Sequence, residues 1–297
     1  MHLDAFLQYL AQGISLGSTY AAIAVGYTII YGVLGLINMA HGDFFMAAAF
    51  VAMWSTTRWH IPLPASLILG TVSAVFGGVL VEKVAYRPLR NAKISAFTST
   101  VAVSMIIETS FILFFTPRPQ AFPRPELLTK VLHVGNVFIP ATVFAVIAVA
   151  IVLFLTLMLV VNRTMVGRAM RALSKDMETT ELMGVNVGRI LSFSFALSTL
   201  FAAAAAFMFC NIYPSIDPFG GVMPGLKGFI GAVVGGIGSI PGALIGGFIL
   251  GLSEIMLVAF MPTLSGFRDA FAYAILIIFL LFRPGGIFNV RVREEKV

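Results

Sequence analysis

Charged residues are scarce in this sequence. They make up 11% of its 297 residues, whereas soluble domains carry about 25%. Hydrophobic residues make up 59%, and the mean hydropathy is +0.98. The apolar residues come in runs of about 20, the length of a membrane-spanning helix, and ten-residue alternating segments typical of outer-membrane barrels are lacking. We therefore expect a polytopic, all-α membrane protein.

Cysteine and the usual catalytic motifs are also scarce. The single cysteine, Cys210, excludes an intramolecular disulfide and a Cys-based metal site. There is no HExxH motif or paired His spacing for zinc and no nucleophile–base constellation, so neither a metal, nor a cofactor, nor enzymatic chemistry is expected. The first Lys or Arg is Arg58, so the N-terminus lacks the basic region of a cleaved signal peptide. We expect the first helix to stay in the mature protein.

Apolar segments predict eight to nine membrane helices, of which one or two are short or half-helices. The segments fall at about 13 to 36, 44 to 58, 64 to 83, 95 to 115, 138 to 161, 190 to 211, 226 to 237, 240 to 261 and 267 to 283. Two of them, 44 to 58 and 226 to 237, are short enough to enter the bilayer and turn, which is tolerated where the backbone is buried in protein.

Basic residues predict the orientation of the chain. Thirteen of the 19 lie in three regions: Lys83, Arg87, Arg90 and Lys93; Arg163, Arg168, Arg171, Lys175 and Arg189; and Arg283, Arg291, Arg293 and Lys296. These regions should be cytoplasmic, which places 116 to 137, 212 to 225 and the N-terminus outside. This distribution also explains the net charge of +6 without nucleic-acid binding.

Glycine is concentrated near the C-terminus. Twelve of the 28 glycines lie between Gly220 and Gly251, with pairs four residues apart, such as Gly242 and Gly246. This spacing lets helices approach closely in lipid. It is more typical of static helix packing than of a moving interface along a substrate pathway.

Few ionisable residues fall within the apolar segments. The candidates for function are Glu108, Glu254, His41 and Asp43, and no Lys or Arg is clearly paired with either Glu at membrane depth. An interhelical hydrogen bond, or a place beside a water-filled cavity, explains the two Glu better than a proton relay. In "GLINMAHGDF" we expect Asn38 to cap a helix and Gly42 to turn the chain near the inner face. Asp43 would then lie at a positive helix N-terminus.

The basic loop at about 162–189 predicts a short helix outside the membrane. Ser174 is placed to cap it, Asp176 and Glu178 to occupy its first turn, and Gly184 to end it. Its face combines Met177, Thr180, Leu182 and Met183 with Glu178 and Glu181. It is suited to a soluble partner, or equally to solvent and anionic lipid.

Four ordered blocks resemble one known family. They are "GSTYAAIAVGYTIIYGVLGLINMAHGDFFMAAA" at 17–49, "VEKVAYRPLR" at 81–90, "GRAMRALSKDMETTELMGVNVGRI" at 167–190 and "FIGAVVGGIGSIPGALIGGFILGLSE" at 229–254. Together they resemble the LivH-type permeases of branched-chain amino acid ABC transporters, in the binding-protein-dependent transport permease family of the bacterial inner membrane. The resemblance implies a single transmembrane permease domain over residues 1–297.

The resemblance also implies partners. They are two cytoplasmic ABC ATPases, a second permease subunit (LivM-like, or a second copy of this chain) and a periplasmic substrate-binding protein. ATP hydrolysis would belong to the ATPases. ABC importers often mark their ATPase-coupling helix with EAAxxxG, and Glu178 and Gly184 keep its ends, while Thr179 and Thr180 replace the alanines and no Leu-Pro follows.

Two sets of candidate residues follow from the resemblance. The coupling set is Ser174, Met177, Glu178, Glu181 and Gly184. The pathway and turn set is Asn38, His41, Gly42, Asp43, Gly235, Gly236, Gly238 and Glu254. The alternatives are an importer of the same class for urea, amides or other amino acids, and an ion-coupled secondary transporter that would use Glu108 or Glu254.

Overall fold

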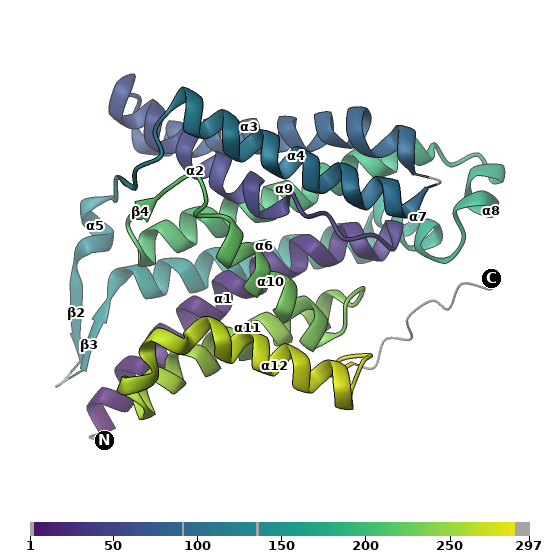
Figure 1. Ribbon diagram of the computed structural model, residues 1–297. Coiled ribbons are helices and arrows are strands. Elements are labelled where there is room, and N and C mark those ends of the chain that lie inside the picture. The colour runs from purple at the N-terminus through teal and green to yellow at the C-terminus, as the bar shows by residue number, and fades with distance from the viewer. Residues whose placement is uncertain (1–2, 91, 135–136, 289–297) are drawn as a thin grey trace.

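The computed structural model describes residues 3–90, 92–134 and 137–288, shown in Figure 1. The basic tail residues Arg291, Arg293 and Lys296 lie outside the described residues.

Nine main helices form the bundle within the residues that the structure describes. Seven described helical segments are long and apolar enough to span a membrane, and the expected all-α polytopic fold is confirmed. The helices of these segments are α1 (Leu3–Leu34), α3 (Leu63–Val81), α4 (Lys93–Phe114), α6 (Ala141–Arg163), α9 (Val187–Ile212), α11 (Ile240–Phe260) and α12 (Arg268–Phe282). The other two helices are α2 (His41–Arg58) and α10 (Val222–Gly235). Short turns η1 (Glu82–Tyr86) and η2 (Arg87–Leu89) continue α3, and η3 (Pro262–Phe267) precedes α12.

The bundle has two chemically different ends (Figure 1). At one end lie η1, η2, α7 (Met165–Lys175) and α8 (Met177–Leu182), together with the basic loops. We call it the basic end. The opposite end carries α5 (Glu126–Thr129) and the hairpin formed by β2 (Val131–Val134) and β3 (Val137–Pro140), and we call it the hairpin end.

Short strands order the loops at the hairpin end. The antiparallel pair β2–β3 aligns Val131 with Pro140, and β1 (Gln120–Ala121) pairs with β4 (Ser215–Ile216). Backbone hydrogen bonds thus join two loops that the sequence places far apart.

Helix α1 is the central helix of the bundle. In its 18-residue apolar window 94% of the residues are buried, and α11, α9, α10 and α6 pack around it. Its contact with α11 uses small residues: a side chain on Gly17 would lie 2.6 Å from the Phe248 carbonyl oxygen. Close backbone approach therefore lets four helices surround one.

Both short helices begin inside the bundle. The first residue of α2, His41, packs against Gly26 and Tyr27 of α1, eight residues before α1 ends and so about 12 Å from that end. Gly221 and Gly225, at the start of α10, touch Gly42 of α2. The chain therefore folds back into the bundle before α2 starts, and the position of this motif at or near the inner face stays a prediction.

Candidate functional site

The segment that enters α2 buries its polar side chains within the bundle. Asn38 is 2% exposed, and its Oδ1 accepts the Ala40 N–H at 3.1 Å. Ala40 occupies the cap position of α2 without a side-chain hydrogen bond, so the prediction that Asn38 caps the helix is wrong. Asn38 instead stabilises the turn before the helix. The neighbouring Met39 N–H donates a hydrogen bond to Thr100 Oγ1 of α4 at 3.2 Å.

His41 is held by neighbours on two other helices. Its Nδ1 lies 3.2 Å from Ser198 Oγ of α9, and its ring centroid lies 4.4 Å from that of Tyr27. The Ser198 hydroxyl donates to the Gly26 carbonyl at 2.8 Å, so its proton is committed to the backbone. His41 is fully buried, and within the described ranges no three His, Cys, Asp or Glu residues gather as metal ligands. The contacts of His41 and Ser198 therefore join α1, α2 and α9.

Gly42 and Asp43 lie in the first turn of α2. Gly42 is helical, so the prediction that it turns the chain is wrong. It is required for contact with α10, because a side chain there would lie 2.6 Å from the Gly221 carbonyl oxygen. Asp43 has the expected place beside the helix N-terminus and is 2% exposed, with Ser104 and Glu108 of α4 as neighbours.

Glycines close the interface between α10 and α11. A side chain on Gly235 or Gly246 would overlap the backbone of the facing helix, and one on Gly242 would lie 2.6 Å from the Gly235 carbonyl oxygen. Gly236 and Gly238, with φ of 109° and 98°, form the turn between the helices, where other residues would be strained. The Ile287 and Phe288 N–H groups donate to Val234 and Gly235 at 2.9 and 3.2 Å, so the chain after α12 holds the end of α10.

Glu254 belongs to a buried charge network. Lys227 Nζ of α10 lies 2.9 Å from Glu254 Oε1 of α11 and 2.8 Å from Asp269 Oδ1 of α12. The Tyr20 hydroxyl of α1 donates to Glu254 Oε2 at 3.1 Å. The expectation that no cation pairs with Glu254 is wrong, whereas the interhelical hydrogen bond is confirmed. Four helices meet at this network.

Lys227 escaped sequence reasoning because its partners are distant in the chain. Glu254 is 27 residues away, so no helical spacing relates the two. The one available signal was a Lys within an apolar segment, since such a charge is costly unless paired.

A second network holds the basic end together. Arg87 donates to both carboxylate oxygens of Glu82 at 2.9 Å, and Ser192 of α9 donates to Glu82 Oε2 at 2.7 Å. Arg87 also donates to the Gly188 carbonyl at 3.0 Å. Glu82 and Arg87 both lie in the block "VEKVAYRPLR", and the sequence alone did not indicate that this block forms an ion pair. They fix the end of α3 to the start of α9.

The coupling candidates lie at the tip of the basic end. Ser174 is in the last turn of α7, so the prediction that it caps the next helix is wrong; Asp176 caps α8, accepting the Thr179 N–H at 3.1 Å. Gly184, with φ of 84°, ends the segment as expected. Met177 is half-buried and Glu178 is exposed.

Large apolar side chains are exposed beside these candidates. Leu182 and Met183 are 84% and 80% exposed. Glu181 lies 3.9 Å from Arg90, which orients the tip relative to η2. An exposed apolar pair rimmed by charges is typical of a protein contact.

Comparisons with known proteins identify the family. The family described as "Branched-chain amino acid transport system / permease component" matches residues 9–280. The permease protein LivH of the high-affinity branched-chain amino acid transport system of Escherichia coli (strain K12) is 36% identical over 305 residues, covering 98% of both chains. The chain belongs to this permease family. It is thus the permease component of a branched-chain amino acid ABC transport system, a class of non-catalytic transmembrane subunits.

Further relatives are similar to this chain to different degrees. BraD, the corresponding permease protein of Pseudomonas aeruginosa, is 35% identical over 98% of both chains. The ribose import permease RbsC of Haemophilus influenzae is 27% identical over 84% of this permease and 76% of its own length. The solved structure "PsaBC from Streptococcus pneumoniae in complex with Fab" shares the fold alone, with a TM-score of 0.51, 13% identity, and coverage of 95% and 93%.

These findings place the permease in a cellular context. It is a multi-pass membrane protein homologous to bacterial inner-membrane permeases. Its family implies ATPase and binding-protein partners.

Proposed function

We propose that this permease moves branched-chain, hydrophobic amino acids across the inner membrane by ATP-driven alternating access. Two ATPases bind the basic end, which is cytoplasmic. A second permease subunit, LivM-like or a second copy of this chain, completes the pathway, and the binding protein delivers substrate at the hairpin end. The single observation that carries the proposal is the exposed tip of the basic end, where Leu182 and Met183 extend beside Glu178 and Glu181.

Motion at the tip has a route into the bundle. Glu181 and Arg90 link α8 to η2, and Arg87 links η2 to α9 through Gly188. Helix α9 reaches the first turn of α2 through Ser198 and His41. In this proposal the turn at 38–43 and the glycine-packed helices α10 and α11 shift as the tip moves, because small residues permit sliding of packed helices.

The secondary-transporter alternative is less well supported. Glu254, one of its two candidate acids, is held between Lys227 and Tyr20 rather than standing unpaired. Urea, amides and other amino acids stay as alternative substrates of the same importer class.

The double variant Leu182→Ser/Met183→Ser tests the ATPase contact. We expect co-purified ATPase to fall about tenfold or more, since apolar anchors dominate protein interfaces, and ATP-dependent leucine uptake to fall with it. Leu132→Ser, an exposed leucine in β2 at the opposite end of the bundle, is the matched control and should retain the co-purified ATPase. Normal ATPase association and normal uptake in the double variant, with equal amounts of permease in the membrane, would contradict the proposal.

A further inference from the structure

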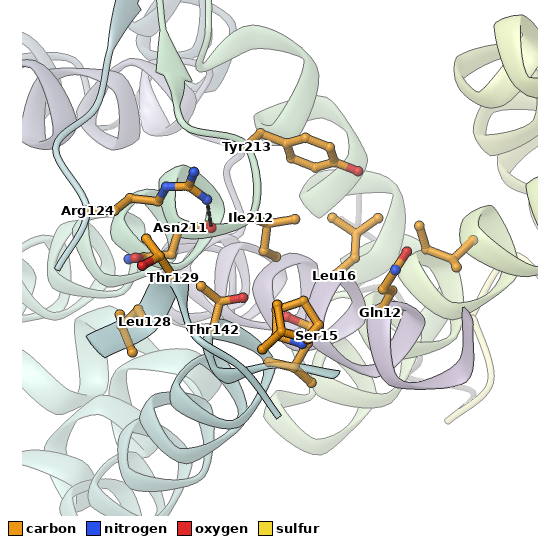
Figure 2. Close-up of a pocket in the computed structure, with 14 residues that line it drawn as sticks. Gln12, Ser15, Leu16, Arg124, Leu128, Thr129, Thr142, Asn211, Ile212 and Tyr213 are labelled. Carbon is orange, nitrogen blue, oxygen red and sulfur yellow. Dashed lines mark hydrogen bonds between the residues drawn. The ribbon is translucent and has the colours of Figure 1, made fainter. Parts of the chain in front are cut away.

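A cavity at the hairpin end is not part of the site described above. Its volume is about 410 Å³, within the range of roughly 300 to 1,000 Å³ typical of small-molecule pockets. It lies between α1, α6 and the end of α9, and the loop that carries Arg124 and α5 borders it (Figure 2). The Phe122 N–H donates to the Pro214 carbonyl at 3.2 Å, which ties this loop to the end of α9.

Two polar side chains that line the cavity have oxygen atoms without a hydrogen-bond partner among the described residues. Asn211 donates its amide N–H to the Phe207 carbonyl at 2.8 Å, and its Oδ1 is buried with no partner among the described residues. Ser15 is 2% exposed, and its Oγ is likewise buried with no hydrogen-bond partner among the described residues. A buried polar atom without a hydrogen bond costs about 1 to 3 kcal/mol. Both atoms are closed to a water-sized probe, so an occupant of the cavity can bond them only when their side chains rotate.

Arg124 gives this polar side a positive charge. Its guanidinium lies beside Asn211 and donates to the Asn211 main-chain oxygen at 3.4 Å, as Figure 2 shows. No carboxylate is found among the residues that line the cavity. A guanidinium has five donors suited to a carboxylate, so the cavity favours an occupant with an acidic group.

The remaining wall is partly aliphatic, beside the polar side chains of Gln12, Thr129, Thr142 and Tyr213. Leu16, Val143, Ile212 and Ile255 contribute to it. An occupant with a branched hydrocarbon group would bury apolar surface there, which is favourable by about 25 cal/mol per Å².

We propose that this cavity is the reception site for the amino acid released by the binding protein. The substrate carboxylate binds Arg124, its ammonium group donates to Asn211 Oδ1 after the Asn211 side chain rotates toward the cavity, and its hydrocarbon side chain contacts the aliphatic part of the wall. Carboxylate and ammonium share one carbon in an amino acid, and the two protein groups that would bind them are adjacent (Figure 2). This inference rests on the proposed function and assigns it a specific site.

Photoaffinity labelling of the complete importer tests the site. The reconstituted complex, with its partners and ATP, is illuminated with a diazirine analogue of leucine, and labelled peptides are mapped by mass spectrometry. We expect label on peptides containing Ser15 or Ile212, competed by leucine and not by glutamate. Arg124→Gln should lower this label about tenfold, because a charge-assisted hydrogen bond is lost, and Arg124→Lys should restore most of it.

Arg118→Gln is the matched control, since Arg118 is an exposed arginine of the same loop that does not line the cavity. Label elsewhere, label unchanged in Arg124→Gln, or a co-purified phospholipid in the cavity that leucine fails to displace would each overturn the inference. Absence of ATP-dependent leucine uptake by the unaltered importer would instead reject the proposed function itself.

Discussion

Helices α1 and α4 are both apolar enough to span a membrane, yet they occupy opposite environments. In the apolar window of α1, 94% of the residues are buried, against 6% in that of α4. Helix α1 has four glycines, of which Gly17 meets the backbone of α11, whereas α4 has none. Glycine content, and not hydropathy, therefore distinguishes the enclosed helix from the peripheral one. Equivalent substitutions around α1 and in α4 test whether the two environments differ in their tolerance of change.

The largest difference is expected for an added side chain. Gly251→Leu on α11 places atoms where the Gly17 backbone of α1 lies, so the helices must separate. We expect a loss of at least about 4 kcal/mol, above the usual cost of overpacking because backbone is displaced, with little folded protein. Ala102→Leu, at an exposed position of α4, should change stability by less than about 0.5 kcal/mol. Heating followed by size-exclusion chromatography measures both, and equal effects would contradict the comparison.

A smaller difference is expected for the membrane acids. Lys227→Met leaves Glu254 buried without its cation, and breaking a buried pair costs about 3 kcal/mol. The double variant Lys227→Met/Glu254→Met should recover at least half of this loss, since it removes the uncompensated charge. Glu108→Gln on α4, where the side chain is only partly buried, should cost less than about 1 kcal/mol. A double variant less stable than the single one would show that the network contributes more than charge neutralisation.

The smallest difference is expected for single hydroxyl groups. Ser198→Ala removes the hydrogen bond to Gly26 and the contact with His41, at a cost of about 1 kcal/mol. Ser110→Ala on α4 removes only a bond to Ile106 of its own helix and should be nearly neutral. Thermal unfolding of the two variants in the same detergent measures the difference in stability. A Ser198→Ala variant with unchanged stability would mean that the α1–α9 contact does not depend on this hydrogen bond.

Local patterns in the sequence were enough to predict much of the bundle. The apolar runs correspond to α1, α3, α4, α6, α9, α11 and α12, because each run must supply its own backbone hydrogen bonds and length. Gly184 was recognised as a helix end because its pattern is local. The prediction for Gly42 was wrong because its role depends on a distant neighbour: it does not turn the chain but packs against Gly221. The prediction for Ser174 was wrong because Asp176, and not Ser174, caps α8.

The sequence alone determined that this chain is a polytopic helical membrane protein with basic loops and a LivH-like motif order. Those properties follow from composition, run length and local spacing. Only the tertiary structure decided that α2 and α10 begin inside the bundle and that Lys227 joins Glu254 to Asp269. It also brought Ser15, Arg124 and Asn211 to one cavity. These residues come from separate segments, and only packing around α1 determines which of them meet.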